Sequence, residues 1–390
     1  MVPAPLFRRF LFAVGFSLLS VSAAVAGDGW TAFGHRPNRE DSQAFSDSPQ
    51  WDGGAFVNPQ KVYSKIIGSF TTFLHASADV EPKLSLPVET GDGSRFRVPP
   101  ATGLRVTWFG HSSMLLEIDG QRVLLDPVWG ERVSPFTWAG PKRWFAPPVA
   151  LEHLPALDVV VLSHDHYDHL DLPTILALQA TGARFVVPLG VGSHLRYWGL
   201  PADRVTELDW WEETAVGALR LTCTPARHAS GRLNPQSNQT LWAGWAFRGP
   251  DHAVWYSGDT GLFPAMRDIG ERLGPFDLTL IESGAYNQAW PDWHLGPEQT
   301  VRAHQMVRGE LLIPVHWGLF NLATHAWTEP AERVTAAAEA AGVQVRIPRP
   351  GQSVEPEALL PFERWWPDVP WRRAEEDPIF SSQMDAAPPG

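Results

Sequence analysis

The chain has 390 residues, of which 44% are hydrophobic and 19% are charged, so it can bury a large core and is not expected to be disordered. Its formal net charge is −12 and its basic residues form no runs, which argues against a nucleic-acid binder, because such proteins need a positive surface for phosphates. The single cysteine, Cys223, excludes an internal disulfide and a cysteine-rich zinc site. Any metal must therefore be held by histidine and carboxylate side chains.

The first 26 residues have the make-up of a secretory signal. An Arg-Arg pair precedes an apolar run, and the small residues Ala-Val-Ala come directly before Gly27. We expect cleavage near Ala26 and export, which makes the mature protein periplasmic or envelope-associated. The alternative is an uncleaved anchor helix.

Residues 27–98 are rich in Gly, Pro and Ser and show weak periodicity, apart from a short helix expected at 60–76. We interpret them as an N-terminal extension that wraps the core. The main domain is expected at 99–350. A tail rich in Trp and Pro, residues 351–390, is expected to wrap around it.

Strand patterns dominate the first half of the domain. Residues 104–110 and 113–126 are apolar or alternate, and Asp119-Gly120 predicts a hairpin turn. A long loop follows at 127–155, before an apolar strand at 157–163. Asp171 can then cap a helix at 172–180.

The second half has a similar make-up. The expected strands are 219–228, 241–249, 252–261, 277–283 and 311–318, and the expected helices are 296–309 and 329–342. Two such halves predict an α/β fold with two packed sheets flanked by helices, a four-layer αββα sandwich.

The segment Ser-His-Asp-His-Tyr-Asp-His-Leu-Asp, residues 163–171, follows an apolar strand and contains the pattern H-x-H-x-D-H. In an extended segment residues two apart face the same way, so His164 and His166 can bind one ion. Asp168 and His169 can then reach a second ion. Imidazole and carboxylate ligands suit a divalent ion such as Zn²⁺. A solvated polar loop is the alternative, but so many ionisable residues would be costly at the end of a buried strand.

Three later strands each end in an isolated polar side chain. These are His228, Asp259 and His316. Each of these residues alone could have an ordinary structural role. In this order after the H-x-H-x-D-H pattern, together they complete a set of ligands for two metal ions.

The chain resembles the metallo-β-lactamase superfamily, in particular its N-acyl-phosphatidylethanolamine-hydrolysing phospholipase D branch. The resemblance rests on FVNP, VTWFGHSSMLLEIDG, LLDPVW, GPKRW, LSHDHYDHLD, SGDTG, GAY and HWG in family order, and covers roughly residues 50–350. It implies two zinc ions, although Mn²⁺ or Fe²⁺ would also fit. The implied ligands are His164, His166 and His228 on one ion, Asp168, His169 and His316 on the other, and Asp259 bridging.

The resemblance also implies a function. We expect a dizinc phosphodiesterase of phospholipase D type, which hydrolyses N-acyl-phosphatidylethanolamine-like lipids by attack of a metal-bound hydroxide. Asp168, Asp259 and His294 are the expected catalytic residues. One alternative is a lactonase or other carboxylic ester or amide hydrolase on the same centre. The other is a non-catalytic metal- or lipid-binding envelope protein.

Three further residues are candidates for contact with the ligands or the substrate. His111 and Tyr286 match family positions, although His111 could be a hydrogen-bonded structural residue. Asp126 could orient a ligand imidazole, or could cap the turn before Pro127. His294 could instead lie on a surface loop.

The long loop is rich in aromatic side chains beside Lys142 and Arg143. Its rings are Trp129, Phe136, Trp138, Trp144 and Phe145. Aromatic rings with nearby cations suit a lipid head-group region, so we expect a lipid or small-molecule substrate and a peripheral membrane contact. The alternative is that the rings cover the core beneath the loop.

Overall fold

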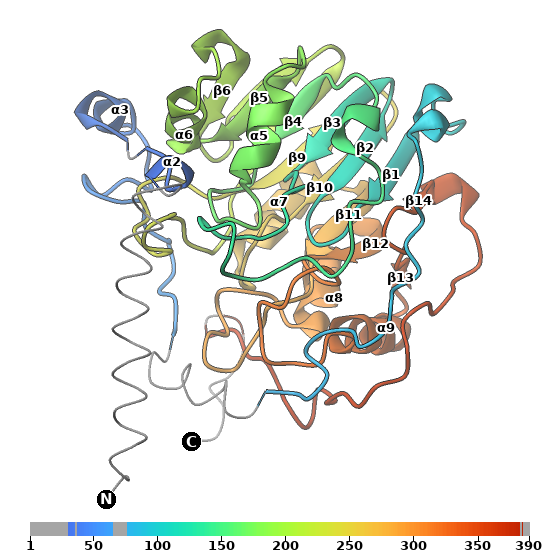
Figure 1. Ribbon diagram of the computed structural model, residues 1–390. Helices are drawn as coiled ribbons and strands as arrows, with labels where there is room; N and C mark the ends of the chain where they lie inside the picture. The colour runs from blue at the N-terminus through green and yellow to red at the C-terminus, as the bar shows by residue number, and fades with distance from the viewer. Residues whose placement is uncertain (1–29, 36, 65–75, 383, 385–390) are drawn as a thin grey trace, which may run out of the picture.

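A computed structural model describes residues 30–35, 37–64, 76–382 and 384. The predicted signal sequence and most of the helix predicted at 60–76 lie outside these residues. Two sheets stack face to face, with helices beside their outer faces (Figure 1). The predicted αββα sandwich is confirmed. No helix in the described part of the chain is long and apolar enough to cross a membrane.

The first sheet has the strand order β14-β1-β2-β3-β4-β5-β6. Its strands are β1 (Leu104–Trp108), β2 (Met114–Ile118), β3 (Gln121–Leu125), β4 (Val159–Val161), β5 (Arg184–Pro188), β6 (Val205–Leu208) and β14 (Ser353–Val354). The predicted turn joins β2 to β3, because Asp119 and Gly120 adopt φ of 47° and 84° and Ile118 pairs with Gln121. Helices α5 (Leu172–Leu178) and α6 (Val191–Tyr197) belong to this half, and Asp171 caps α5 as predicted.

The second sheet has the strand order β13-β12-β11-β10-β9-β8-β7. Its strands are β7 (Glu213–Val216), β8 (Leu219–Thr224), β9 (Gly244–Arg248), β10 (Ala253–Tyr256), β11 (Phe276–Glu282), β12 (Gly309–Val315) and β13 (Gln344–Val345). The helices of this half are α7 (Ala265–Leu273), α8 (Pro297–Met306) and α9 (Glu329–Ala341), of which α8 and α9 were predicted.

The extension and the tail contribute little regular structure. The extension contains the short helices α2 (Trp30–Ala32) and α3 (Arg39–Ala44) and a 3-10 turn at Ser94–Arg97. The segment assigned to the tail begins with β14, which pairs with β1. Farther on, Trp365 and Trp366 are buried and pack against Trp317. The tail is therefore part of the folded structure rather than a loose end.

The main core lies between the two sheets. Val161 of β4 and Trp245 of β9 are fully buried and belong to one hydrophobic cluster. The indole N–H of Trp245 donates to the carbonyl oxygen of Leu162 over 2.9 Å, so the sheets are also hydrogen-bonded to each other just before the His-rich segment. A second cluster fills the space under α5 and α6. Because both faces of the first sheet are covered, β4 can be a wholly apolar strand.

A surface ion pair also joins the two sheets. Nδ1 of His252, between β9 and β10, lies 2.6 Å from Oδ1 of Asp119. Burial alone would lower the pKa of His252, but the hydrogen bond to Asp119 and the charges of Asp119, Asp277 and Glu357 raise it above 6.5. Burial alone would raise the pKa of Asp119, whereas hydrogen bonds from His252 hold it below 3.8.

The stabilising effect of this pair should depend on pH in a defined direction. The contribution of His252 is complete below the unfolded pKa of 6.5 and is lost as the pH rises through the raised folded pKa. The contribution of Asp119 is lost as the pH falls below 3.8. Urea unfolding should therefore show that His252→Gln destabilises the protein most between pH 3.8 and pH 6.5 and least at pH 9. The exposed His153→Gln is the control; a His252→Gln effect of equal size at pH 5.5 and pH 9 would contradict the prediction.

Candidate metal centre

Three histidine nitrogens converge where the two sheets meet. His164 and His166 follow β4 of the first sheet, and His228 follows β8 of the second. Nδ1 of His166 lies 2.9 Å from Nε2 of His164 and 3.3 Å from Nε2 of His228. Ligands bound tetrahedrally to zinc lie about 3.3 Å apart, so this triad has the spacing of a metal site.

A second triad lies beside the first. Oδ2 of Asp168 is 3.4 Å from Nε2 of His169 and 3.3 Å from Nε2 of His316, which follows β12. One carboxylate and two imidazoles form the mixed ligand set that zinc and similar divalent ions accept.

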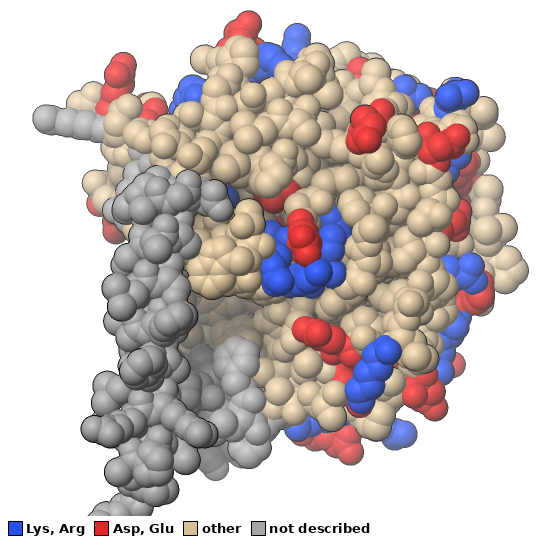
Figure 2. All heavy atoms as spheres, in the orientation of Figure 1, with Lys and Arg blue, Asp and Glu red and all other residues tan. Residues whose placement is uncertain are grey.

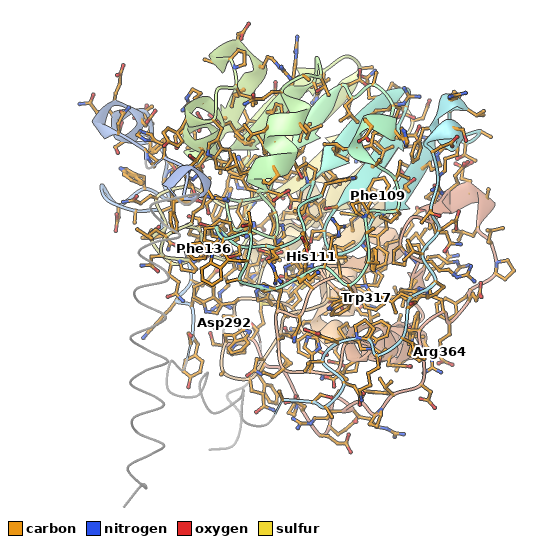
Figure 3. The ribbon with its side chains drawn as sticks, in the orientation of Figure 1. Phe109, His111, Phe136, Asp292, Trp317 and Arg364 are labelled. Atoms are coloured by element: carbon orange, nitrogen blue, oxygen red, sulfur yellow. The ribbon has the colours of Figure 1, made fainter. Side chains whose placement is uncertain are left out.

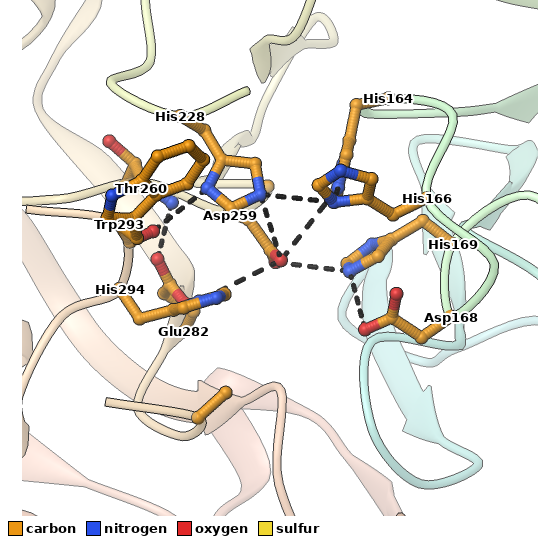
Figure 4. A network of polar contacts seen from close by, with 12 residues as sticks. His164, His166, Asp168, His169, His228, Asp259, Thr260, Glu282, Trp293 and His294 are labelled. Carbon is orange, nitrogen blue, oxygen red and sulfur yellow. Dashed lines mark hydrogen bonds and ion pairs between the residues drawn. The ribbon is translucent and has the colours of Figure 1, made fainter. Parts of the chain in front are cut away.

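Asp259, just after β10, lies between the triads (Figure 4). Its Oδ1 is 3.2 Å from Nε2 of His169, and its Oδ2 is 3.0 Å from Nε2 of His316 and 3.7 Å from Nε2 of His228. A carboxylate in this position can bind two cations at once, whereas a neutral imidazole cannot.

Unpaired polar atoms indicate that a cation fits here. Nε2 of His169, Nε2 of His316 and Oδ1 of Asp259 are buried and make no hydrogen bond to any of the described residues. Leaving buried polar atoms unpaired is costly, and native structures rarely do so. A divalent ion would be a partner for all three atoms.

The charge balance of the two triads differs. Burial, with the charges of neighbouring histidines, holds the pKa of His164 and His228 well below 6.5, so both are neutral imidazoles, as a metal ligand must be. Burial acts in the same direction on His169 and His316, but the carboxylates around them, Asp259 and Asp168 among them, together outweigh it. The pKa of His169 is raised well above 6.5 and that of His316 to about 10. The carboxylates around the second triad therefore favour a positive charge at this position, which a bound cation would supply in place of the protons on the two imidazoles.

Comparison with known proteins identifies the family. A family model described as "Beta-lactamase superfamily domain" matches residues 121–317, about half of the chain. The chain belongs to the metallo-β-lactamase superfamily.

Relatives of known sequence and structure agree with this assignment. The N-acyl-phosphatidylethanolamine-hydrolyzing phospholipase D 1 of Caenorhabditis elegans is 38% identical over 60% of this chain and 69% of its own length. An uncharacterized protein of Mycobacterium tuberculosis is 49% identical over 82% of this chain and 87% of its own. A solved metallo hydrolase from Ignicoccus hospitalis is 25% identical, with a TM-score of 0.51 over 64% of this chain and 97% of its own. The protein is a metal-dependent hydrolase, and the predicted resemblance to the phospholipase D branch is confirmed.

In this metallo-β-lactamase-superfamily hydrolase, the second ring nitrogen of four histidines of the two triads is held by an oxygen of the chain. The contacts are His164 Nδ1 to Ser163 Oγ (3.0 Å), His166 Nε2 to Pro235 O (3.0 Å), His169 Nδ1 to Asp126 Oδ2 (2.7 Å) and His228 Nδ1 to Trp293 O (2.9 Å). Such contacts fix the tautomer and aim the ligating nitrogen. Of the two interpretations of Asp126, the structure shows the one in which it contacts a ligand imidazole.

His111 contacts a ligand of the second triad. It is buried, and its Nε2 lies 2.9 Å from Oδ2 of Asp168. His111 and His316 adopt positive φ, 52° and 64°, and their rings lie 4.2 Å apart. Non-glycine residues are strained in this region, and such strain is concentrated at functional sites.

His294 lies at the edge of the centre, where sequence reasoning placed it. Its Nδ1 is 2.7 Å from Oε2 of Glu282 and 3.9 Å from Oδ2 of Asp259. Glu282, the last residue of β11, is fully buried and was missed by sequence analysis. The signal was available, because Glu282 is a charged residue at the carboxyl end of an apolar strand, like the residues of the two triads.

Tyr286 is directed away from the ligands. Its hydroxyl donates to Oε1 of Glu329 over 2.8 Å, and its ring stacks on His325. A buried carboxylate needs hydrogen-bond donors, and Tyr286 supplies one at the start of α9. The predicted substrate contact is therefore not what the structure shows for this hydroxyl.

Proposed function

We propose that this hydrolase is a dizinc phosphodiesterase of phospholipase D type, with N-acyl-phosphatidylethanolamine-like lipids as substrates. The observation that carries the proposal is Asp259, which is shared between two complete ligand triads. The substrate class is supported by the similarity to the worm enzyme. Two divalent ions held there would supply a hydroxide nucleophile at neutral pH and polarise the oxygen under attack.

His294 is placed to protonate the leaving group. His294 is partly exposed, whereas Glu282 behind it is fully buried. The contact between Glu282 and Nδ1 of His294 fixes the ring at the rim of the centre. From this position the imidazole can give a proton to the departing oxygen as the phosphorus–oxygen bond breaks.

The lipid character of the substrate is supported by two rings of the loop after β3. Trp138 is 52% exposed, and its ring lies 5.5 Å from that of Phe136. In the view of Figure 3, Phe136 lies to the left of His111. Exposed aromatic rings favour the interface of a lipid bilayer. The face shown in Figure 2 has mostly uncharged side chains, with acidic and basic groups mixed.

The other rings of this loop cover the core. Trp129 packs against Phe109, Trp144 packs against Trp327, and Phe145 joins a small apolar cluster. The alternative interpretation of the loop thus holds for these three rings, and only Phe136 and Trp138 remain for a membrane contact.

A substrate panel tests the proposal. The zinc-loaded protein should convert vesicles of N-acyl-phosphatidylethanolamine to phosphatidic acid and N-acylethanolamine, both measured by mass spectrometry. Removal of metal with a chelator should abolish this conversion, and added zinc should restore it.

The remaining outcomes separate the alternatives. Hydrolysis of an acyl lactone without any cleavage of the lipid would favour a lactonase on the same centre. Stoichiometric metal with no turnover of lipid, lactone or a simple phosphodiester would favour a non-catalytic binding protein. Undiminished turnover after complete removal of metal would contradict every metal-dependent version.

A further inference from the structure

A buried ion pair lies directly behind one side of the metal centre. Nη1 of Arg227 is 2.8 Å from Oδ1 of Asp292, and both side chains are completely buried. Arg227 immediately precedes the ligand His228. Asp292 immediately precedes Trp293, whose carbonyl oxygen contacts Nδ1 of His228 over 2.9 Å. The pair therefore ties together the two loops that fix the position of one ligand imidazole.

The far end of the chain completes this pair. The backbone N–H and the hydroxyl of Ser382 donate to Asp292 over 2.9 and 2.5 Å, and Nη2 of Arg227 donates to the Ser382 hydroxyl over 3.1 Å. Ser381 accepts from Nη1 of Arg227 over 3.4 Å and donates to the carbonyl oxygen of Leu262 over 2.8 Å. We name residues 379–382 the C-terminal clasp.

Packing holds the clasp in place. Ile379 is buried, and a Cβ added to Gly296 would lie 2.8 Å from the Cβ of Ile379, so the glycine permits a close approach. The side-chain amide of Gln299, in the first turn of α8, donates to the carbonyl oxygen of Ile379 over 3.2 Å. The clasp therefore packs against the loop that also carries His294.

A buried charge pair is stable only when its remaining hydrogen-bonding positions are filled. Asp292 accepts four hydrogen bonds, from Arg227, from the backbone N–H of Tyr63 and twice from Ser382. Half of them come from the clasp. Without the clasp, Asp292 would need water or a new orientation, and Trp293 would move with it.

We propose that Arg227 and Asp292 are positioning residues for the metal ligand His228, and that the C-terminal clasp is required to hold them in that position. The contact from Trp293 to His228 transmits the effect to the first triad, whereas the second triad is fixed by other residues. This inference depends on metal binding but not on which bond the enzyme cleaves.

The test uses the full chain carrying Ser381→Ala and Ser382→Ala, which removes the hydroxyls and keeps the ion pair. Titration of the metal-free protein with Co²⁺ should show that one of the two equivalents binds about 10–100-fold more weakly. The visible absorption of that equivalent should also change. The other equivalent should bind as in the wild type.

Controls separate positioning from general stability. Ser42→Ala with Ser46→Ala removes two hydroxyls that bind only backbone carbonyl oxygens of α3 and its end, and it should leave both cobalt equivalents unchanged. Ser382→Thr keeps a hydroxyl and should restore tight binding. Wild-type affinity and spectrum in the double alanine variant would overturn the proposal, and so would a lower melting temperature with unchanged cobalt binding.

Discussion

Replacing Asp259 with asparagine is expected to reduce hydrolysis by on the order of 10³-fold or more and to lower the bound zinc to one ion per chain or fewer. The amide has one ligating oxygen and no charge, so it cannot serve both triads as the carboxylate does. It also leaves His169 and His316 facing each other without the negative charge that now lies 3.2 and 3.0 Å from their Nε2 atoms.

Metal analysis of the purified variant, together with kcat/KM on the best substrate of the panel, measures both effects. Asp203→Asn changes an exposed aspartate in the same way and should retain two zinc ions and full activity. An Asp259→Asn protein with two tightly bound zinc ions and wild-type kcat/KM would show that Asp259 is not the shared ligand.

Replacing Asp126 with asparagine should affect both stability and metal binding. Asp126 is fully buried and accepts from four donors: the Ser163 N–H, the Ser163 hydroxyl, Nδ1 of His169 and the Tyr256 hydroxyl, at 2.7, 2.6, 2.7 and 2.5 Å. An asparagine would turn its own N–H₂ donor towards some of these donors. Each buried group left unpaired costs about 1–3 kcal/mol.

We expect Asp126→Asn to lower the free energy of unfolding by about 1–3 kcal/mol, because the Ser163 N–H, which donates to Oδ1, loses its acceptor when the amide nitrogen replaces that oxygen, and the other orientation would leave three donors unpaired. The affinity for the metal ion bound by His169 should fall about 10–100-fold. Urea unfolding and zinc competition with a chromophoric chelator measure the two effects. Asp92→Asn, in an exposed turn where the carboxylate accepts from the N–H of Ser94, should change neither quantity. Loss of stability without loss of zinc affinity would mean that Asp126 does not orient His169.

The clustering of the seven candidate ligands could be predicted because each follows an apolar strand and the H-x-H-x-D-H spacing places two nitrogens on one side of an extended chain. The presence of two packed sheets flanked by helices followed from the similar make-up of the two halves of the domain. Residues 184–216 gave no usable signal, because β5, β6, β7 and α6 are each seven residues or shorter and show no long periodic pattern.

The contacts behind the ligands could not be predicted in the same way. Glu282 acquires its role from His294 and from the backbone N–H of Thr260, which approach it from separate loops. Tyr286 is directed to Glu329, 43 residues farther along the chain, and Asp292 is completed by Ser382, 90 residues away. Short-range patterns contain no information on such partners, which are determined only when distant segments pack together.

The two triads have one further property, which concerns how the protein unfolds. The candidate ligands come from both sheets. Four follow a strand of the first sheet (His164, His166, Asp168 and His169), and three follow strands of the second (His228, Asp259 and His316). Each ion would therefore act as a cross-link between the halves, in a chain whose lone cysteine rules out an internal disulfide. Metal loading should make the two sheets unfold as one cooperative unit. In the metal-free protein, amide hydrogen exchange should rise first in the strands of the two sheets that carry the candidate ligands.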